Sequence, residues 1–145
     1  MKYLGSRVLE TDRLLLRPTK EEDLKVIWGI LCDKRVAKNY LVGKFNYDWE
    51  KEKVWQYKKL ANNEDVFQWS IILKSENKCI GQASCQKSYD EFGNENSDNI
   101  RDVGWFLDFN YHGIGYGSEA ARAMIDYMFK EVQIDKIETC AATDN

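Results

Sequence analysis

The sequence contains few of the residues that cross-link a chain, bind metals or break helices. It has a single proline, a single histidine and four cysteines among 145 residues. No two cysteines form a Cys-x-x-Cys pair, and the histidine, His112, is far from all four in the sequence. We therefore predict neither a disulfide framework nor a metal site.

Long apolar runs and an excess of positive charge are also lacking. No long apolar run follows residues 1–7, so we expect no signal peptide, no membrane span and a cytoplasmic protein. The 21 Lys and Arg residues are outnumbered by 24 Asp and Glu residues, which gives a net charge of -3. A nucleic-acid partner therefore has no electrostatic support.

The length and organisation of the chain predict one domain over residues 1–145. A chain of this size buries an adequate core without disulfides. No internal repeat, low-complexity tract or linker interrupts it.

The first predicted elements are a strand and a helix. The apolar segment 13–17 ends at Pro18, which favours a strand terminated by proline. Thr19 and Glu22 then have the spacing of a capping box, and apolar residues recur at helical spacing. We predict a helix over about 20–32.

A second helix is predicted over about 46–63, after the cap residues that begin it. Several aromatic residues on the helical side are candidates to line an acceptor pocket, although aromatics at this spacing more often belong to the core: Trp28, Tyr40, Trp49 and Trp55.

The middle of the chain changes to strand periodicity. Segments 66–73 and 78–85 are rich in β-branched and aromatic residues and flank a turn, which predicts a β-hairpin. The polar stretch 89–99 is long for a connection and is either a loop on the substrate side or a disordered insertion. A further strand is predicted over 99–108.

The last predicted elements are a helix and a strand at 135–142. The helix carries an apolar stripe that we expect to face a sheet, formed by Ala120, Ala121, Met124, Ile125, Met128, Phe129 and Val132. The order of elements predicts a mixed α/β (α+β) fold, in which a mostly antiparallel sheet is flanked by helices and has one parallel crossover.

The connection between the strand 99–108 and that helix has glycine at every second position. Gly113, Gly115 and Gly117 lack the Cβ atoms that would keep a ligand away from the main chain. Backbone N–H groups of such a loop, at the positive end of a helix dipole, favour an anion. We predict that a phosphate-bearing cofactor binds here.

Two nucleotide-binding alternatives are less well supported. The start of a dinucleotide fingerprint is present at Gly113 and Gly115, but Ser118 replaces its third small residue, and the loop comes late in the chain. Asp135 lies at a suitable distance for a ribose contact, so this alternative stays open. No Gly-Lys-Ser/Thr follows the loop, which excludes a P-loop.

Several segments, taken in order, resemble the GNAT (Gcn5-related) N-acetyltransferase superfamily, in particular its ribosomal-protein N-acetyltransferase-like branch. They extend over nearly the whole chain: 10–18, 69–71 with 80–81, 102–107, 111–120 and 142–145. The resemblance implies acetyl-CoA as co-substrate and a primary amine as acceptor. That amine is either a protein N-terminal α-amine or a small-molecule amine.

The resemblance also assigns roles to residues. His112, Gly115 and Gly117 occupy the three defined places of the family's Arg/Gln-x-x-Gly-x-Gly/Ala motif, and His112 departs from it. Loop scaffolding is favoured for His112 over catalysis. Asp102 is the candidate general base, with a solvent-facing structural carboxylate as the alternative. The implied cofactor-binding residues are Trp105, Phe106, Leu107, His112, Gly113, Ile114, Gly115, Tyr116, Gly117, Ser118 and Asn145.

Family members continue beyond the position of Asn145 with a helix and a hairpin. From this we expect the chain to be C-terminally incomplete, and either inactive or completed by pairing with another chain, such as a homodimer. A non-catalytic acetyl-CoA-binding or interaction module is the corresponding functional alternative.

Overall fold

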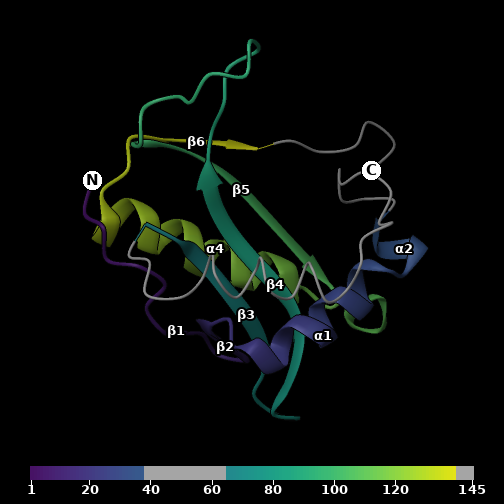
Figure 1. Ribbon diagram of the computed structural model, residues 1–145. Helices are drawn as coiled ribbons and strands as arrows, with labels where there is room; N and C mark the ends of the chain where they lie inside the picture. Colours follow the sequence, from purple (N-terminus) through teal and green to yellow (C-terminus); the bar gives the residue numbers. More distant parts are fainter. Residues whose placement is uncertain (38–64, 140–145) are drawn as a thin grey trace.

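The computed structural model describes residues 1–37 and 65–139 (Figure 1). Its elements are β1 (Leu9–Glu10), β2 (Leu14–Pro18), α1 (Glu21–Leu31), α2 (Lys34–Ala37), β3 (Phe67–Leu73), β4 (Lys78–Lys87), β5 (Ile100–Leu107), the 3-10 turn η1 (Phe109–Tyr111), α4 (Tyr116–Tyr127), the π-helical segment η2 (Met128–Val132) and β6 (Lys136–Thr139). The second helix predicted over 46–63 lies outside the described residues.

The six strands form one sheet in the order β1-β2-β3-β4-β5-β6. Each strand is antiparallel to its neighbour except β6, which is parallel to β5 and is reached through α4. The predicted mixed, mostly antiparallel sheet is therefore confirmed, as is the hairpin of β3 and β4. The two-residue strand β1 was not predicted, because it is too short to have a recognisable period.

The sheet has a helix on each face (Figure 1). Alternate residues of the central strands pack with α4 in the larger core, which includes Phe67, Trp69, Ala83, Val103, Leu107, Ala120, Met124 and Met128. The side chains between them point to the opposite face, where Phe106 packs against Ile27 and Ile30 of α1. We call these the α4 face and the α1 face.

The start of α1 differs from the predicted capping box. The cap residue is Lys20, and Asp23 rather than Glu22 accepts a hydrogen bond from the Lys20 amide, at 2.8 Å. The Thr19 hydroxyl instead lies 3.2 Å from the Ser70 hydroxyl, within hydrogen-bonding distance. Asp23 is nearly buried and also binds both terminal nitrogens of Arg17, at 2.6 and 2.9 Å, so tertiary contacts displaced the cap by one residue.

The apolar stripe of α4 and η2 is confirmed at most positions. Ala120, Ala121, Met124, Met128 and Val132 are buried. The exceptions are Ile125, which is only partly buried, and Phe129, whose exposed fraction is 42%. The helix widens to a π-helix from Met128. A wider turn changes the angle between successive side chains around the helix axis, and this accounts for the outward position of Phe129.

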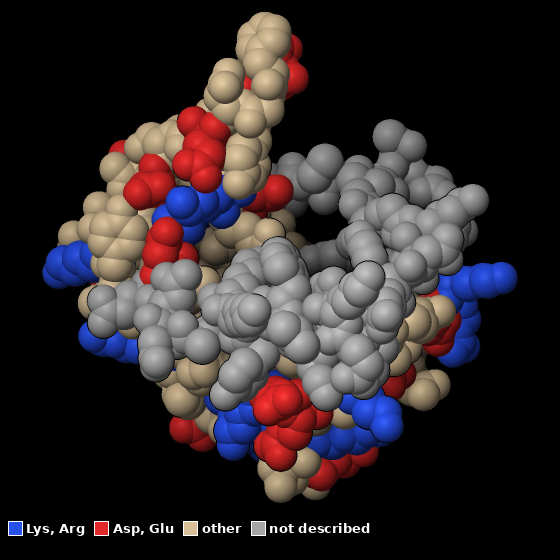
Figure 2. Space-filling model, in the orientation of Figure 1, with Lys and Arg blue, Asp and Glu red and all other residues tan. Residues whose placement is uncertain are grey.

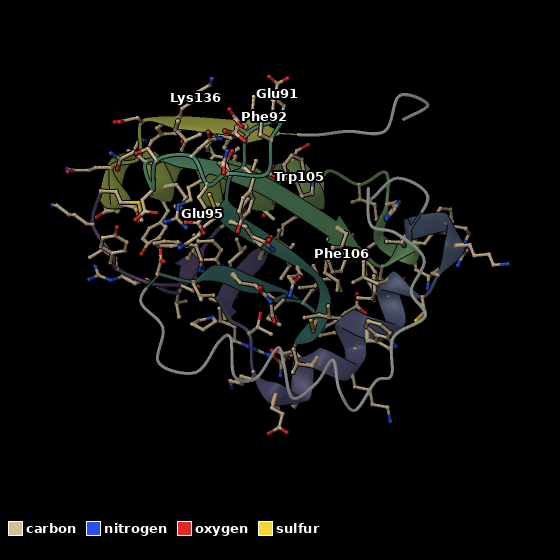
Figure 3. The ribbon with its side chains drawn as sticks, turned by 45° about the horizontal axis from the view of Figure 1, so that its top comes forward. Glu91, Phe92, Glu95, Trp105, Phe106 and Lys136 are labelled. Atoms are coloured by element: carbon tan, nitrogen blue, oxygen red, sulfur yellow. The ribbon has the colours of Figure 1, made fainter. Side chains whose placement is uncertain are left out.

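The connection between β4 and β5 projects from one end of the sheet, at the top of Figure 1. It has defined backbone contacts: a bridge pairs Tyr89 with Glu95, and the Asn96 amide donates to the Ser88 carbonyl at 2.8 Å. These contacts favour an ordered loop over a disordered insertion. Its substrate-side role stays a prediction. Figure 3 shows Phe92 and Glu91 on this loop, and Phe92 is 80% exposed.

Candidate active site

Two glycines of the loop have a backbone conformation that favours glycine. Gly113 and Gly115 have φ angles of 78° and 92°, in the left-handed region that disfavours side chains. A Cβ built on Gly113 would meet nothing within 4 Å, and one on Gly115 would meet only the Arg13 Nη2 atom, at 3.4 Å. The two glycines therefore leave open space next to the main chain.

The first turn of α4 presents unpaired donors. Gly115 is the cap residue and, among the described residues, no side chain caps the helix. The first intrahelical hydrogen bond after it runs from the Glu119 amide to the Gly115 carbonyl, at 3.1 Å. The amides of Tyr116, Gly117 and Ser118 thus lack intrahelical partners and are available to an anion.

A side-chain network attaches the turn between β1 and β2 to this loop. Glu119 accepts hydrogen bonds from the Thr11 hydroxyl at 2.6 Å, the Arg13 amide at 3.0 Å and Arg13 Nε at 2.8 Å. Arg13 also donates to the Ile114 carbonyl at 3.2 Å and lies 4.4 Å above the Tyr116 ring. This fixes the loop and places a guanidinium beside it. The sequence did not reveal this role of Arg13, because its partner is 106 residues away.

Main-chain groups at the end of β5 point away from β4. The Asp108 amide donates to Ile80 of β4 at 2.7 Å. Because such pairs alternate along an antiparallel strand, Phe106 also faces β4, whereas the N–H and C=O groups of Trp105 and Leu107 point the other way. The pairing of β5 with β6 within the described residues ends at Val103. Figure 3 shows Trp105 and Phe106 along β5.

The His112 ring lies within this backbone. Its Nε2 atom is 2.9 Å from the Leu107 carbonyl oxygen, and the ring is 5.1 Å from that of Phe109. A ring that bridges the strand end and the glycine loop supports the scaffolding role. This contact uses the Leu107 carbonyl, which is one of the two main-chain groups of Leu107 that point away from β4.

The candidate base Asp102 lies on the α1 face of β5 and is exposed. It is directly opposite Gln86 of β4 and Glu138 of β6. Partial burial and then the Glu138 charge raise the pKa of Asp102 above its usual value. Glu138 itself accepts a hydrogen bond from Ser88, at 2.7 Å, and faces Lys136 at 3.7 Å. The contribution of Glu138 was not predicted, since strand register determines it.

The other predicted site residues are distributed as follows. Ile114 is 51% exposed on the loop, and Tyr116 is partly buried. A Cβ on Gly117 would lie 3.2 Å from Trp105 Nε1, so the two residues are in contact across the β5–α4 connection. Asn145 lies outside the described residues, as do Tyr40, Trp49 and Trp55. Among the described residues, no helix is long and apolar enough to cross a membrane.

Comparison with known proteins places this geometry in a family. Residues 13–145 match the family described as "Acetyltransferase (GNAT) domain". The chain is 30% identical over 137 residues to the Bacillus subtilis "Uncharacterized N-acetyltransferase YnaD", with 94% of this chain and 74% of the relative covered.

Solved structures agree on the fold. A GNAT-family acetyltransferase from Bacillus anthracis superposes with a TM-score of 0.76 at 24% identity, over 95% of this chain and 75% of that one. The "Ribosomal-protein-S5-alanine Acetyltransferase" from Vibrio fischeri gives a TM-score of 0.68 at 23% identity, over 91% and 72%. The chain belongs to the GNAT acetyltransferase family, as its motifs predicted, and its enzyme class is N-acetyltransferase.

Proposed function

We propose that this chain transfers an acetyl group from acetyl-CoA to a primary amine by direct attack. The observation that carries the proposal is the glycine loop, where two left-handed glycines lead into an uncapped helix start. Amides from Gly113 to Ser118 would hold the pyrophosphate, and Arg13 adds a positive charge beside them. A 2.8 Å ion pair with Glu119 reduces the net effect of that charge.

The end of β5 would orient the reacting part of the co-substrate. The N–H groups of Trp105 and Leu107 point away from β4 and would pair with the pantetheine arm, and one of them would donate to the thioester carbonyl oxygen as charge develops there. In the reaction, the amine nitrogen attacks the carbonyl carbon and a C–N bond forms. The C–S bond then breaks, and CoA leaves as the thiolate.

The proton that the amine loses would go to Asp102, directly or through one water. A raised pKa makes Asp102 a stronger base than an ordinary aspartate. This assignment of Asp102 is part of the proposal, as are the cofactor-binding roles of the loop residues and of Asn145. We also propose that residues 1–145 form a single domain.

Two measurements test the proposed function. Titration with acetyl-CoA, CoA and NAD is expected to raise the unfolding midpoint for the first two only, because a ligand that binds the native state stabilises it. Release of free CoA thiol in the presence of a panel of primary amines then measures turnover. Stabilisation by NAD but not by CoA would overturn the proposal, and binding of CoA without turnover would favour a non-catalytic module.

A further inference from the structure

The α1 face of the sheet has a polar strip next to Asp102. Strand register places Gln68 of β3 opposite Ser84 of β4, and Ser84 opposite Gly104 of β5. Two residues further along β4, the next row of opposed residues on this face contains Gln86, Asp102 and Glu138. All six lie on the α1 face, because directly opposed residues of paired strands point to the same side. A strip of this kind at the centre of a sheet is unusual, since such positions normally carry core residues.

Gln68 is the unusual member of this strip. Its side chain is 3% exposed, and its Nε2 atom has no hydrogen-bond partner within residues 1–37 and 65–139. The nearest polar groups on the face have other partners: Ser70 donates to Asp23 at 2.9 Å, and Ser84 accepts from Gln86 at 3.4 Å. A buried amide donor without an acceptor destabilises the folded state, and one that persists calls for a specific explanation.

The position of Gln68 relative to the proposed chemistry supplies that explanation. Gly104 precedes Trp105, whose main chain would hold the thioester end, and it adds no side chain to this face of β5. The Cα atoms of Gln68 and Asp102 are two strand spacings and two residues apart, roughly 12 Å. Their side chains point to the same face of the sheet.

We propose that Gln68 is a specificity-determining residue that donates a hydrogen bond to an oxygen of the acceptor substrate. The acceptor class is then an amine that carries a nearby carbonyl or hydroxyl oxygen, as the first residue of a peptide does, rather than a simple alkyl diamine. In this arrangement the amine of the acceptor binds next to the Asp102 and Glu138 carboxylates, which suit its cationic form. The oxygen of the acceptor accepts a hydrogen bond from Gln68 Nε2. This inference rests on the proposed function, and it decides between the two acceptor classes left open there.

The test compares two probes, a short peptide with a free N-terminal amine and a linear diamine without oxygen. Wild-type kcat/KM is expected to favour the peptide by about 10- to 100-fold, because a site built to donate to an oxygen discriminates against a ligand that lacks it. In Gln68→Met this preference is expected to disappear while KM for acetyl-CoA stays unchanged. Gln68→Glu, which has no donor and adds a negative charge, is expected to favour the diamine.

A binding measurement separates the inference from the proposed function. Peptide and diamine are each titrated against the CoA-bound protein, and the shift in unfolding midpoint is recorded. Peptide stabilisation that is lost in Gln68→Met supports the role of Gln68 even in the absence of turnover. If wild type binds or acetylates both probes equally well, the inference is wrong while the proposed function stands.

Two controls make the result specific. Gln82→Met makes the same change on the same face of the sheet, one row nearer α1 than Gln68. It is expected to keep the kcat/KM preference for the peptide over the diamine. Free Gln68→Met should unfold at the same temperature as wild type or higher, because the change removes an unpaired buried donor. A large loss of stability would instead show that Gln68 has a structural partner, and would overturn the proposal.

Discussion

At the scale of single residues, the candidate site depends on two carboxylates on adjacent strands. Asp102 is identifiable from the sequence by its position in a strand that resembles a family motif. Glu138 acquires a role only because β6 is parallel to β5 and brings it directly opposite. The two residues lead to distinct predictions for the rate and for its pH dependence.

Asp102→Asn removes the proposed base but keeps the side-chain shape. We expect kcat to fall about 100-fold, which is within the usual contribution of general base catalysis. KM for acetyl-CoA should change little, since Asp102 lies on the α1 face and away from the glycine loop. Steady-state kinetics of CoA release measures both. An unchanged kcat would assign Asp102 to the solvent-facing structural alternative.

Glu138→Gln tests the electrostatic environment of that base. The Glu138 charge is one of the two causes that raise the pKa of Asp102, and burial is the larger. Removal of the charge should lower that pKa, so the rate should begin to rise at a lower pH than in wild type. The pH profile of kcat/KM reports the shift when the acceptor is a weakly basic amine that stays unprotonated over the range, because only the free amine attacks. A shift to higher pH would contradict the assignment.

At the scale of elements, the glycine loop is defined by its backbone. Gly115→Ala places a side chain at a φ of 92°, and we expect it to cost about 1–3 kcal/mol of stability. It should also weaken CoA binding, because the new Cβ narrows the space beside Arg13. Urea unfolding and calorimetric titration with CoA are the measurements.

The matched control is a glycine inside a helix. Gly29 of α1 is exposed, and a Cβ there would meet nothing within 4 Å. Gly29→Ala should therefore stabilise the protein by about 0.5–1 kcal/mol and leave CoA affinity unchanged. Equal effects of the two substitutions would show that the loop has no special requirement for glycine.

At the scale of the whole molecule, α1 is joined to the sheet through a nearly buried carboxylate. Asp23 accepts bonds from Arg17, the Lys20 amide and Ser70. Burial alone would raise its pKa, but these bonds outweigh burial and lower the pKa below its usual 3.8. Because the pKa is lowered, the contribution of Asp23 to the free energy of unfolding is fully present above about pH 4 and is lost as the pH falls through the folded-state pKa.

Asp23→Asn should accordingly destabilise the protein by about 3 kcal/mol at neutral pH, because it leaves the Arg17 charge without its partner. The difference from wild type should shrink as the pH is lowered below about 4, where Asp23 itself becomes protonated. Urea unfolding over a pH series measures this difference. A gap that stays constant with pH would contradict the role of the ionised carboxylate.

Charge is unevenly distributed over the molecule. Acidic side chains are visible on the projecting loop between β4 and β5, and both acidic and basic side chains lie around its base, on the face that Figure 2 shows. Asp90, Glu91, Glu95 and Asp98 all belong to this connection, which contains no Lys or Arg between Ser88 and Asn99. An acidic surface of this kind suits a cationic acceptor and agrees with the negative net charge.

The sequence alone determined the order of most strands and helices, because apolar periodicity and turn residues are local properties. It also predicted the glycine loop, since glycine at every second position between a strand and a helix is a local pattern. Tertiary structure decided what depends on register and on distant partners. Lys20 and Asp23 took the places predicted for Thr19 and Glu22 at the start of α1, with Asp23 also bound to Ser70. Arg13 met Glu119, and Glu138 and Gln68 came to share a face with Asp102. The physical reason is that strand pairing and buried polar contacts join residues tens of positions apart, and no local pattern records such pairs.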